Sequence, residues 1–149
     1  AQVFMENQFD GLIGSPFAAA DEILQNAPKS DIIIVDFHSE ATSEKRGFGF
    51  YLDGKVSAVL GTHTHVQTAD AQVLPGGTAY ISDAGMCGAA DSVLGVKPEL
   101  ALERMLTGKK VPLEGKETEE SEVGYVVMDI DEANGKAREI KAYLERVRI

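Results

Sequence analysis

The stretch DIIIVDFH, residues 31–38, does most to decide the fold. Its run of β-branched residues is typical of a strand buried on both faces, and it leads directly into His38. A second apolar run, KVSAVLG at residues 55–61, leads in the same way into the segment THTH at residues 62–65. A third strand is expected at residues 78–82. Because ligand sites in open α/β sheets favour the edge where strands end, these runs predict an α/β fold with its site at that edge.

Helices and a hairpin complete the expected elements. Apolar spacing and helix-start residues predict helices at residues 16–27, 43–50 and 98–106. In the last of these helices, Leu100, Met105 and Leu106 are expected to contact the core. The C-terminal tail alternates apolar and polar residues on both sides of an Asn134-Gly135 turn, which predicts an antiparallel strand pair at residues 122–131 and 136–147. Residues 113–122 are interpreted as an exposed connector.

Composition limits the classes of function. The chain has 149 residues, of which 44% are hydrophobic and 26% charged, as expected for a globular domain with a core. A net charge of -10 without a Lys/Arg-rich run argues against binding to an extended nucleic acid, but a metal could still attract a small anionic substrate. The single cysteine, Cys87, excludes an intrachain disulfide, and no apolar run approaches the ~20 residues that cross a bilayer. We therefore expect a cytoplasmic protein without a membrane partner.

Three histidines are the principal candidates for a chemical site. His38, His63 and His65 are the only histidines in the sequence, and each stands at or just beyond the end of a predicted strand. If residues 62–66 are extended, His63 and His65 point to the same side, whereas on a helix they would diverge by about 200°. Neutral imidazoles bind Zn, Fe, Mn and similar ions, so these three could hold one ion or supply part of two. The alternative is that each is an ordinary surface or core histidine.

Three carboxylates are candidates to support the histidines. A metal-bound histidine usually donates its second ring N–H to a carboxylate or a carbonyl oxygen. Asp36 and Glu40 flank His38, and Asp83 follows the third predicted strand. An ordinary solvated carboxylate at a strand end is the alternative interpretation.

Longer segments around the histidines carry a family resemblance. They are DFHSEATSEK at residues 36–45, GTHTHVQTAD at residues 61–70 and GTAYISDAGM at residues 77–86. In these segments the chain resembles the bacterial metallophosphoesterases of the YmdB type, within the calcineurin-like superfamily. A bare His-x-His would be a weak signal, but the long flanking matches make the resemblance specific, and it covers most of the chain.

The resemblance has implications for fold, cofactor and activity. It implies half of a four-layer α/β/β/α sandwich that holds two divalent metal ions, with Fe or Mn expected and Zn or Mg as alternatives. It also implies phosphodiesterase activity on cyclic nucleotides such as 2′,3′-cAMP. Carried over by motif, His38 and His63 would bind one ion and His65 would bind its neighbour.

The sequence also departs from the family pattern. The family's earlier motifs supply an Asp, a bridging Glu, metal-binding Asn residues and a catalytic His, and none of these motifs is found here. Since residues 3–5 resemble the tail of a strand already begun, residues 1–149 are interpreted as the C-terminal portion of a longer domain; a sequence trimmed of a tag is the alternative. We expect the chain to supply the histidine ligands, to be weakly active or inactive alone, and to partner with an N-terminal half or another protomer, as a homo-oligomer.

Two rival functions need separate tests. Another metal hydrolase with a His-x-His motif, such as an amidohydrolase, requires a full (β/α)₈ barrel, for which 149 residues are too few. The other rival is a non-catalytic metal-binding or interaction module that assembles with another chain through exposed apolar sheet.

Overall fold

A computed structural model of the chain describes residues 14–26, 28 and 30–148. The strand expected at residues 3–5 lies outside the described residues. The elements in chain order are α1 (Pro16–Asn26), β1 (Ile34–His38), α2 (Thr42–Leu52), β2 (Ala58–Thr62), β3 (Gln72–Val73), β4 (Ala79–Ile81), β5 (Cys87–Ala89), α3 (Pro98–Thr107), β6 (Glu120–Ile130) and β7 (Ala137–Arg148). The predicted helices, the three predicted strands and the C-terminal pair are all present, with shifted ends.

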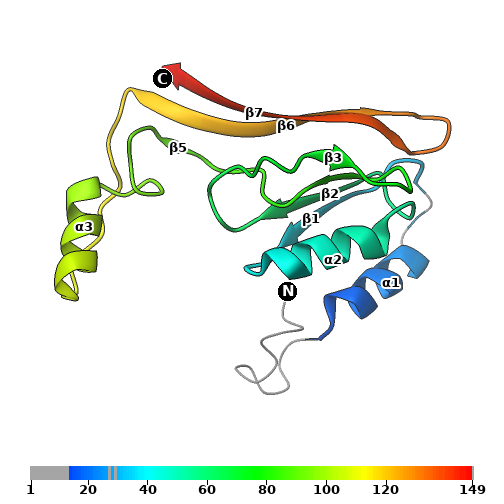
Figure 1. Cartoon of the computed structure of the whole chain (residues 1–149), viewed down its shortest axis with the longest axis horizontal. Helices are drawn as coiled ribbons and strands as arrows, with labels where there is room; N and C mark the ends of the chain where they lie inside the picture. Colours follow the sequence, from blue (N-terminus) through cyan, green and yellow to red (C-terminus); the bar gives the residue numbers. More distant parts are fainter. Residues whose placement is uncertain (1–13, 27, 29, 149) are drawn as a thin grey trace.

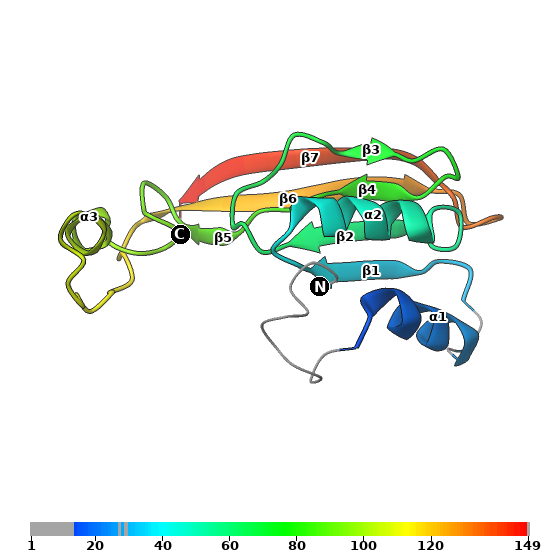
Figure 2. The ribbon, with the colours of Figure 1, turned by 60° about the horizontal axis from the view of Figure 1, so that its bottom comes forward.

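Two sheets lie face to face. The first has the strand order β1-β2-β4-β3, in which β1, β2 and β4 are parallel and β3 is antiparallel to β4. The second has the order β5-β6-β7 and is antiparallel throughout. Helices α1 and α2 cover one face of the first sheet, and the β6–β7 hairpin covers the other (Figure 1). The turned view shows the same layers with β1 at the open edge of the first sheet (Figure 2). The described elements thus form a mixed α/β fold with a C-terminal antiparallel sheet.

Side chains of the first sheet alternate between two cores. Val59 and Tyr80 pack with Phe48 and Leu52 of α2 on the helix side. Their neighbours in sequence point the other way, toward the hairpin, since successive side chains of a strand alternate between its faces. The core on the hairpin side contains Ala58, Ala79, Ile81, Ala137 and Ile140. Each sheet face therefore buries apolar surface, and this fixes the register of the parallel strands.

Helix α2 packs unusually close to β4 at a glycine. Gly47 and Gly49 weaken a helix, because glycine is unfavourable in a helix interior by about 1 kcal/mol relative to alanine. A Cβ atom at Gly49 would lie 2.5 Å from Cδ2 of Tyr80. Gly49 therefore allows the helix backbone to rest directly on the Tyr80 ring.

Strand β1 corrects one prediction about burial. The run at residues 31–36 was expected to be buried on both faces, but β1 begins at Ile34, and Ile34 is 52% exposed. Among the described strands β1 pairs only with β2, so it lies at the sheet edge. The β-branched composition predicted the strand correctly, but the prediction that both of its faces are buried is wrong.

Helix α3 lies away from both sheets (Figure 1). The prediction that Met105 and Leu106 contact the core is wrong, because these side chains are 71% and 83% exposed. Ala101 is the buried residue of the helix. Gly108 ends α3 in the left-handed conformation at φ 67°, as expected for a helix C-terminus.

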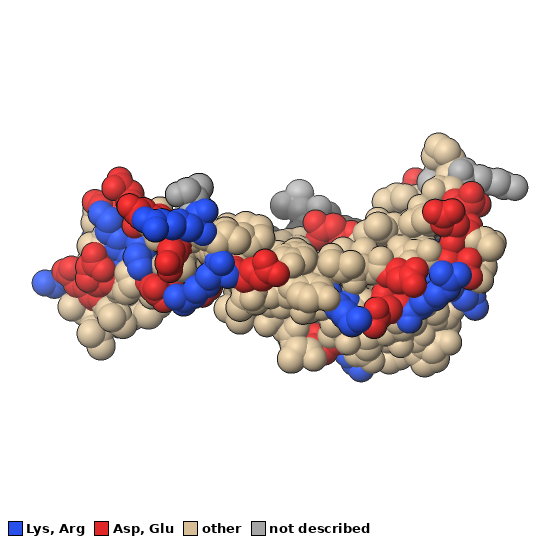
Figure 3. Space-filling model, turned by 90° about the horizontal axis from the view of Figure 1, so that it is seen from above, with Lys and Arg blue, Asp and Glu red and all other residues tan. Residues whose placement is uncertain are grey.

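The outer surface on the side of the β6–β7 hairpin has no extended basic area. Seen from above, acidic and basic side chains mix in two groups, with uncharged surface between them (Figure 3). Arg146 exemplifies this mixing, since its guanidinium lies 2.7 Å from Asp91 and 3.1 Å from Glu122. None of the helices in the described ranges is both long enough and apolar enough to cross a lipid bilayer.

Candidate metal centre

The carboxyl ends of β1 and β2 bring two of the histidines together. The strands are parallel and in register, with His38 opposite Thr62. His63 follows Thr62 immediately, so both rings reach the same edge of the sheet. Their ring centroids are 5.1 Å apart, and Nε2 of His38 lies 3.3 Å from Nδ1 of His63.

A hydrogen-bonded chain sets the protonation pattern of His38. Oγ1 of Thr62 lies 3.1 Å from Oδ1 of Asp36 and 3.1 Å from Nδ1 of His38. An ionised carboxylate can only accept, so the single hydroxyl proton of Thr62 goes to Asp36. The same hydroxyl oxygen then accepts the Nδ1–H of His38. In neutral His38 the free lone pair therefore lies on Nε2, the atom that faces His63.

The spacing of the two nitrogens fits a shared metal ion. Two imidazole nitrogens that each lie about 2.1 Å from one ion are roughly 3.0 Å apart at a right angle and about 3.4 Å apart at the tetrahedral angle. The observed separation between Nε2 of His38 and Nδ1 of His63 is 3.3 Å. Metal-bound histidines characteristically donate their other N–H to a hydrogen-bond acceptor, as His38 does to Thr62.

The segment after β2 differs from the prediction. Residues 62–66 were expected to be extended, but β2 ends at Thr62, and φ is 146° at His63 and 63° at His65. Positive φ is rare for residues other than glycine and is concentrated at functional sites. Because the strand does not continue, alternation of side chains does not bring His63 and His65 to one side.

His65 is not part of the observed pair. Within the described residues, its side chain makes no hydrogen bond or ring contact with His38 or His63. The described part of the chain also contains no group of three or more His, Cys, Asp or Glu side chains placed to hold an ion. The structure therefore brings His38 and His63 together as a pair and leaves His65 on the adjoining loop.

The three candidate carboxylates have different surroundings. Asp36 reaches His38 through Thr62, as described above. Glu40 is exposed and makes no hydrogen bond to another residue in the described ranges. Asp83 is 1% exposed and touches neither ring of the pair; it accepts hydrogen bonds from Nζ of Lys45 at 2.9 Å, from the Thr64 N–H at 2.7 Å and from the Gly85 N–H at 3.0 Å.

These contacts govern the charge of Asp83. Burial raises its pKa, but the hydrogen bond from Lys45 and those from the Thr64 and Gly85 N–H groups outweigh burial. The net pKa of Asp83 is therefore lowered from the ordinary value, and the group is held as a carboxylate. A buried carboxylate thus contacts the loop that carries His63 and His65.

Asp70 anchors the far end of the same loop. Its carboxylate accepts hydrogen bonds from the Ser82 N–H at 3.1 Å, from the Ser82 hydroxyl at 2.6 Å and from the Thr68 hydroxyl at 2.7 Å. Burial raises the pKa of Asp70, but the hydrogen bonds from Ser82 and Thr68 have the larger effect. The net pKa of Asp70 is therefore below its ordinary value. Arg46 adds an ion pair at 3.7 Å.

Gln67 ties the loop to the second sheet. Its side-chain amide lies 3.1 Å from the carbonyl oxygen of Ala84, 3.3 Å from that of Tyr125 and 2.9 Å from that of Tyr143. The amide nitrogen therefore donates toward backbone oxygens of both β6 and β7. The position of the histidine loop depends in this way on the C-terminal hairpin.

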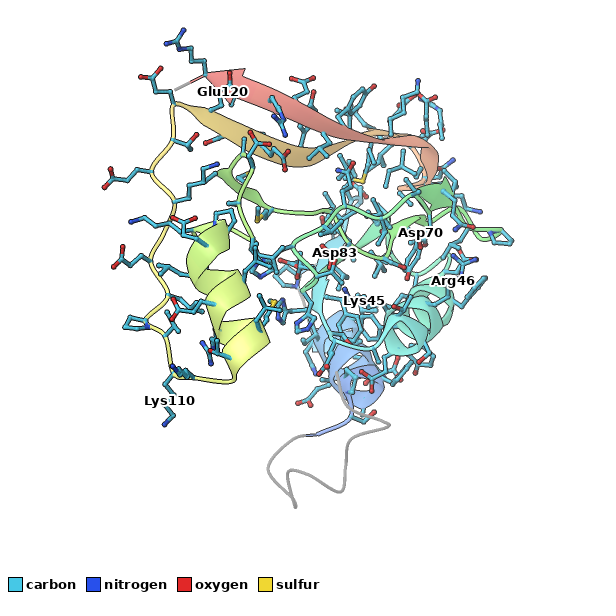
Figure 4. The ribbon with its side chains drawn as sticks, turned by 60° about the vertical axis from the view of Figure 1, so that its left-hand side comes forward. Lys45, Arg46, Asp70, Asp83, Lys110 and Glu120 are labelled. Carbon is cyan, nitrogen blue, oxygen red and sulfur yellow. The ribbon has the colours of Figure 1, made fainter. Side chains whose placement is uncertain are left out.

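Sequence reasoning missed Thr62 and Lys45. Thr62 would have been found from strand register, because the two parallel strands that end in histidine place it opposite His38. Lys45 had no comparable signal, since a lysine in a helix is usually solvated. Figure 4 shows Lys45 and Asp83 approaching one another from α2 and from the segment after β4, while Lys110 and Glu120 lie far from them.

The fold and site together define a class: an α/β protein with a histidine pair at the carboxyl edge of a parallel sheet. Residues 1–143 match the family described as YmdB-like protein, and the chain belongs to this family. The resemblance seen in the sequence is confirmed.

Relatives of known name or structure agree with this assignment. The chain is 48% identical over 136 residues to a Bacillus subtilis (strain 168) protein named 2′,3′-cyclic-nucleotide 2′-phosphodiesterase, covering 89% of this chain and 50% of that protein. The crystal structure of a hypothetical protein from Thermus thermophilus matches with a TM-score of 0.81 and 40% identity, over 89% of this chain and 51% of that one. A phosphatase from Mycoplasma pneumoniae matches with a TM-score of 0.82 and 35% identity, over 89% and 47%. The chain thus spans about half the length of each of these relatives.

Proposed function

We propose that this chain is part of a dinuclear metal-dependent phosphodiesterase that acts on cyclic nucleotides such as 2′,3′-cAMP. His38 and His63 are ligands of one ion and His65 is a ligand of the second, with Fe or Mn as the expected metals. The observation that carries the proposal is the 3.3 Å separation between Nε2 of His38 and Nδ1 of His63. The name of the Bacillus subtilis relative supports the substrate class.

The residues around the histidine pair each have a defined part in this proposal. Bound divalent ions would supply Lewis-acid stabilisation of a phosphate group. His38 and His63 would hold one ion, and Thr62 with Asp36 would keep the Nδ1 proton of His38 in place, so that Nε2 stays available as a ligand. Neither histidine would transfer a proton to the substrate, so the general acid is assigned to residues outside this pair. A fourth layer, completing an α/β/β/α sandwich, is proposed for the longer form represented by the relatives.

Metal binding and hydrolysis test the proposal together. Calorimetric titration with Mn²⁺ should show one ion whose binding His38→Ala and His63→Ala each abolish, while the ion assigned to His65 remains. Lys110→Ala serves as the control, because Lys110 is far from the histidine edge (Figure 4). Hydrolysis of 2′,3′-cAMP is then followed by chromatography, with the chain alone and with the remaining half of the Bacillus subtilis relative added as a separate polypeptide. We expect little turnover alone and clear turnover in the mixture.

Two results would contradict this proposal. An unchanged number of bound Mn²⁺ ions in both histidine variants would remove the proposed His38/His63 ion from this edge of the sheet. Rapid hydrolysis by the chain alone would refute the expectation that it needs further residues.

A second candidate function is assembly with another chain without catalysis. It is favoured by the apolar groove between α1 and the open edge of β1, where Ile23 is 64% and Ile34 is 52% exposed. Exposed apolar surface of this kind often marks an interaction site. Sedimentation velocity discriminates the two functions: self-association that Ile34→Glu removes, together with no Mn²⁺ binding, would favour assembly.

A further inference from the structure

A buried ion pair lies next to the histidine loop. Nζ of Lys45 is 2.9 Å from Oδ2 of Asp83, and the two side chains are only 2% and 1% exposed. Lys45 comes from α2 and Asp83 from the segment after β4, and Figure 4 shows them meeting between these elements. The two residues are 38 positions apart, so tertiary packing alone brings them together.

The same carboxylate holds the loop at its centre. Oδ2 of Asp83 accepts the Thr64 N–H at 2.7 Å in addition to the Lys45 ammonium. The backbone of Asp83 adds a second attachment, because its carbonyl oxygen accepts the Thr68 N–H at 3.0 Å. Asp83 therefore holds the loop at two points, four residues apart in sequence.

The residue held by Asp83 lies between the two strained histidines. His63 and His65, on either side of Thr64, have φ values of 146° and 63°. A backbone conformation of this kind is unfavourable for residues other than glycine and persists only where its surroundings enforce it. Two described contacts of Thr64 are placed to hold this backbone: its N–H donates to Asp83, and its hydroxyl donates to the Val66 carbonyl oxygen at 2.8 Å. Of the two, the bond to Asp83 ties the loop to another part of the fold.

Stability by itself does not account for the ion pair. Replacing a buried ion pair with apolar residues of similar volume is often neutral or even stabilising. A neutral amide would also serve the loop less well, because it offers one acceptor oxygen, whereas the Asp83 carboxylate uses Oδ2 for Thr64 and Oδ1 for Gly85. The geometry therefore calls for a carboxylate at this position and for a cation beside it.

We infer that Asp83 and Lys45 are positioning residues for the metal centre. Asp83 fixes the backbone at Thr64 and with it the directions in which the His63 and His65 side chains leave the loop, and Lys45 compensates the buried charge. This inference rests on the proposed metal function. Neither residue touches the ion or the substrate.

Asp83→Asn is tested against a matched control, Asp53→Asn. Asp53 also accepts two backbone N–H groups, from Gly76 at 2.7 Å and from Thr78 at 3.3 Å, but at the opposite end of β4. Both substitutions should lower the melting temperature. Only Asp83→Asn should weaken Mn²⁺ binding, by about 10- to 100-fold, as is usual for residues that orient metal ligands. Equal Mn²⁺ affinities in the two variants would overturn the inference.

A second readout works without metal. Hydrogen exchange of the Thr64 amide should be slow in the wild type and at least about tenfold faster in Asp83→Asn, while amides of β2 keep their protection. If the wild type binds no Mn²⁺, the proposed function fails, and the Thr64 exchange rate alone decides whether Asp83 positions the loop. A Thr64 amide that exchanges equally in Asp83→Asn and Asp53→Asn would overturn the inference.

A double variant guards against misfolding of Asp83→Asn. Lys45→Met with Asp83→Leu removes both charges and keeps the interior filled, so it should fold. It should show the same fast Thr64 exchange and the same weak Mn²⁺ binding as Asp83→Asn. Wild-type behaviour in both measurements would show that the pair is dispensable and would refute the positioning role.

Discussion

Replacing Thr62 by valine isolates the contact that orients His38. The two side chains have nearly the same volume, so Thr62→Val removes one hydroxyl and little packing. That hydroxyl accepts the Nδ1–H of His38 at 3.1 Å and donates to Asp36 at 3.1 Å. Both contacts are exposed, so the free energy of unfolding should fall by about 1 kcal/mol or less.

The effect on the metal should be larger than the effect on stability. Removing a residue that fixes the orientation of a histidine ligand typically weakens metal binding about 10- to 100-fold. At about 1.4 kcal/mol for each factor of ten, this corresponds to roughly 1.4–2.8 kcal/mol. The difference arises because His38 loses the acceptor that holds its proton on Nδ1, and with it the preference for a lone pair on Nε2.

Calorimetric titration with Mn²⁺ at neutral pH measures the affinity, and ¹⁵N spectra of the metal-free imidazoles report the tautomer. Thr107→Val is the control, because Thr107 donates to the Glu103 carbonyl within α3, far from the histidines. The reasoning is refuted if Thr62→Val and Thr107→Val bind Mn²⁺ alike. A metal-free His38 that carries its proton on Nε2 in the wild type would refute it equally.

Four further predictions concern the centre and the fold. His65→Ala should halve the number of Mn²⁺ ions bound and leave the ion at His63, which metal analysis after dialysis would show; loss of both ions would contradict the assignment. Coordinated imidazole must be neutral, so Mn²⁺ affinity should fall below about pH 6, and an affinity that is flat across this range would exclude histidine ligation. The pKa of Asp70 is lowered in the folded state, so its contribution to stability is present above about pH 4 and is lost on further acidification. In urea unfolding, the Asp70→Asn variant should therefore lose less stability on acidification than the wild type does, and equal losses would contradict this. Leu52→Ala empties a site that is 0% exposed and should destabilise the protein by about 2–5 kcal/mol in the same assay, and a change below about 1 kcal/mol would show that the core collapses around the gap.

The regular elements were predictable because they depend on local patterns. Helical spacing identified α1, α2 and α3, and alternation identified the β6–β7 hairpin. The starts of β1 and β2 were placed three residues too early, at residues 31 and 55, whereas the hydrogen-bonded ladder begins at Ile34 and Ala58. Strands β3 and β5 were missed because β3 has only two residues and β5 lies in a glycine-containing segment without an apolar run.

The site was predictable in its residue types and not in its geometry. His38 and His63 were selected because both follow strand-forming runs, and parallel pairing brings them to one edge. The extended conformation expected after Thr62 is wrong, since a tertiary contact of Thr64 with Asp83 holds that segment as a loop. Backbone conformation in such a loop is set by partners that are distant in sequence, and a local pattern contains no information about them.

By itself, the sequence determined the longer helices and strands, the candidate metal-binding side chains, and the family to which the chain belongs. Only the tertiary structure decided that Thr62 joins Asp36 to His38, that Lys45 is buried against Asp83, and that Ile34 lies on the outermost of the described strands of its sheet. The physical reason is how far apart in the sequence the interacting residues lie. Secondary structure follows from the spacing of neighbouring residues, whereas an ion pair or a metal centre requires a register between segments that only packing establishes.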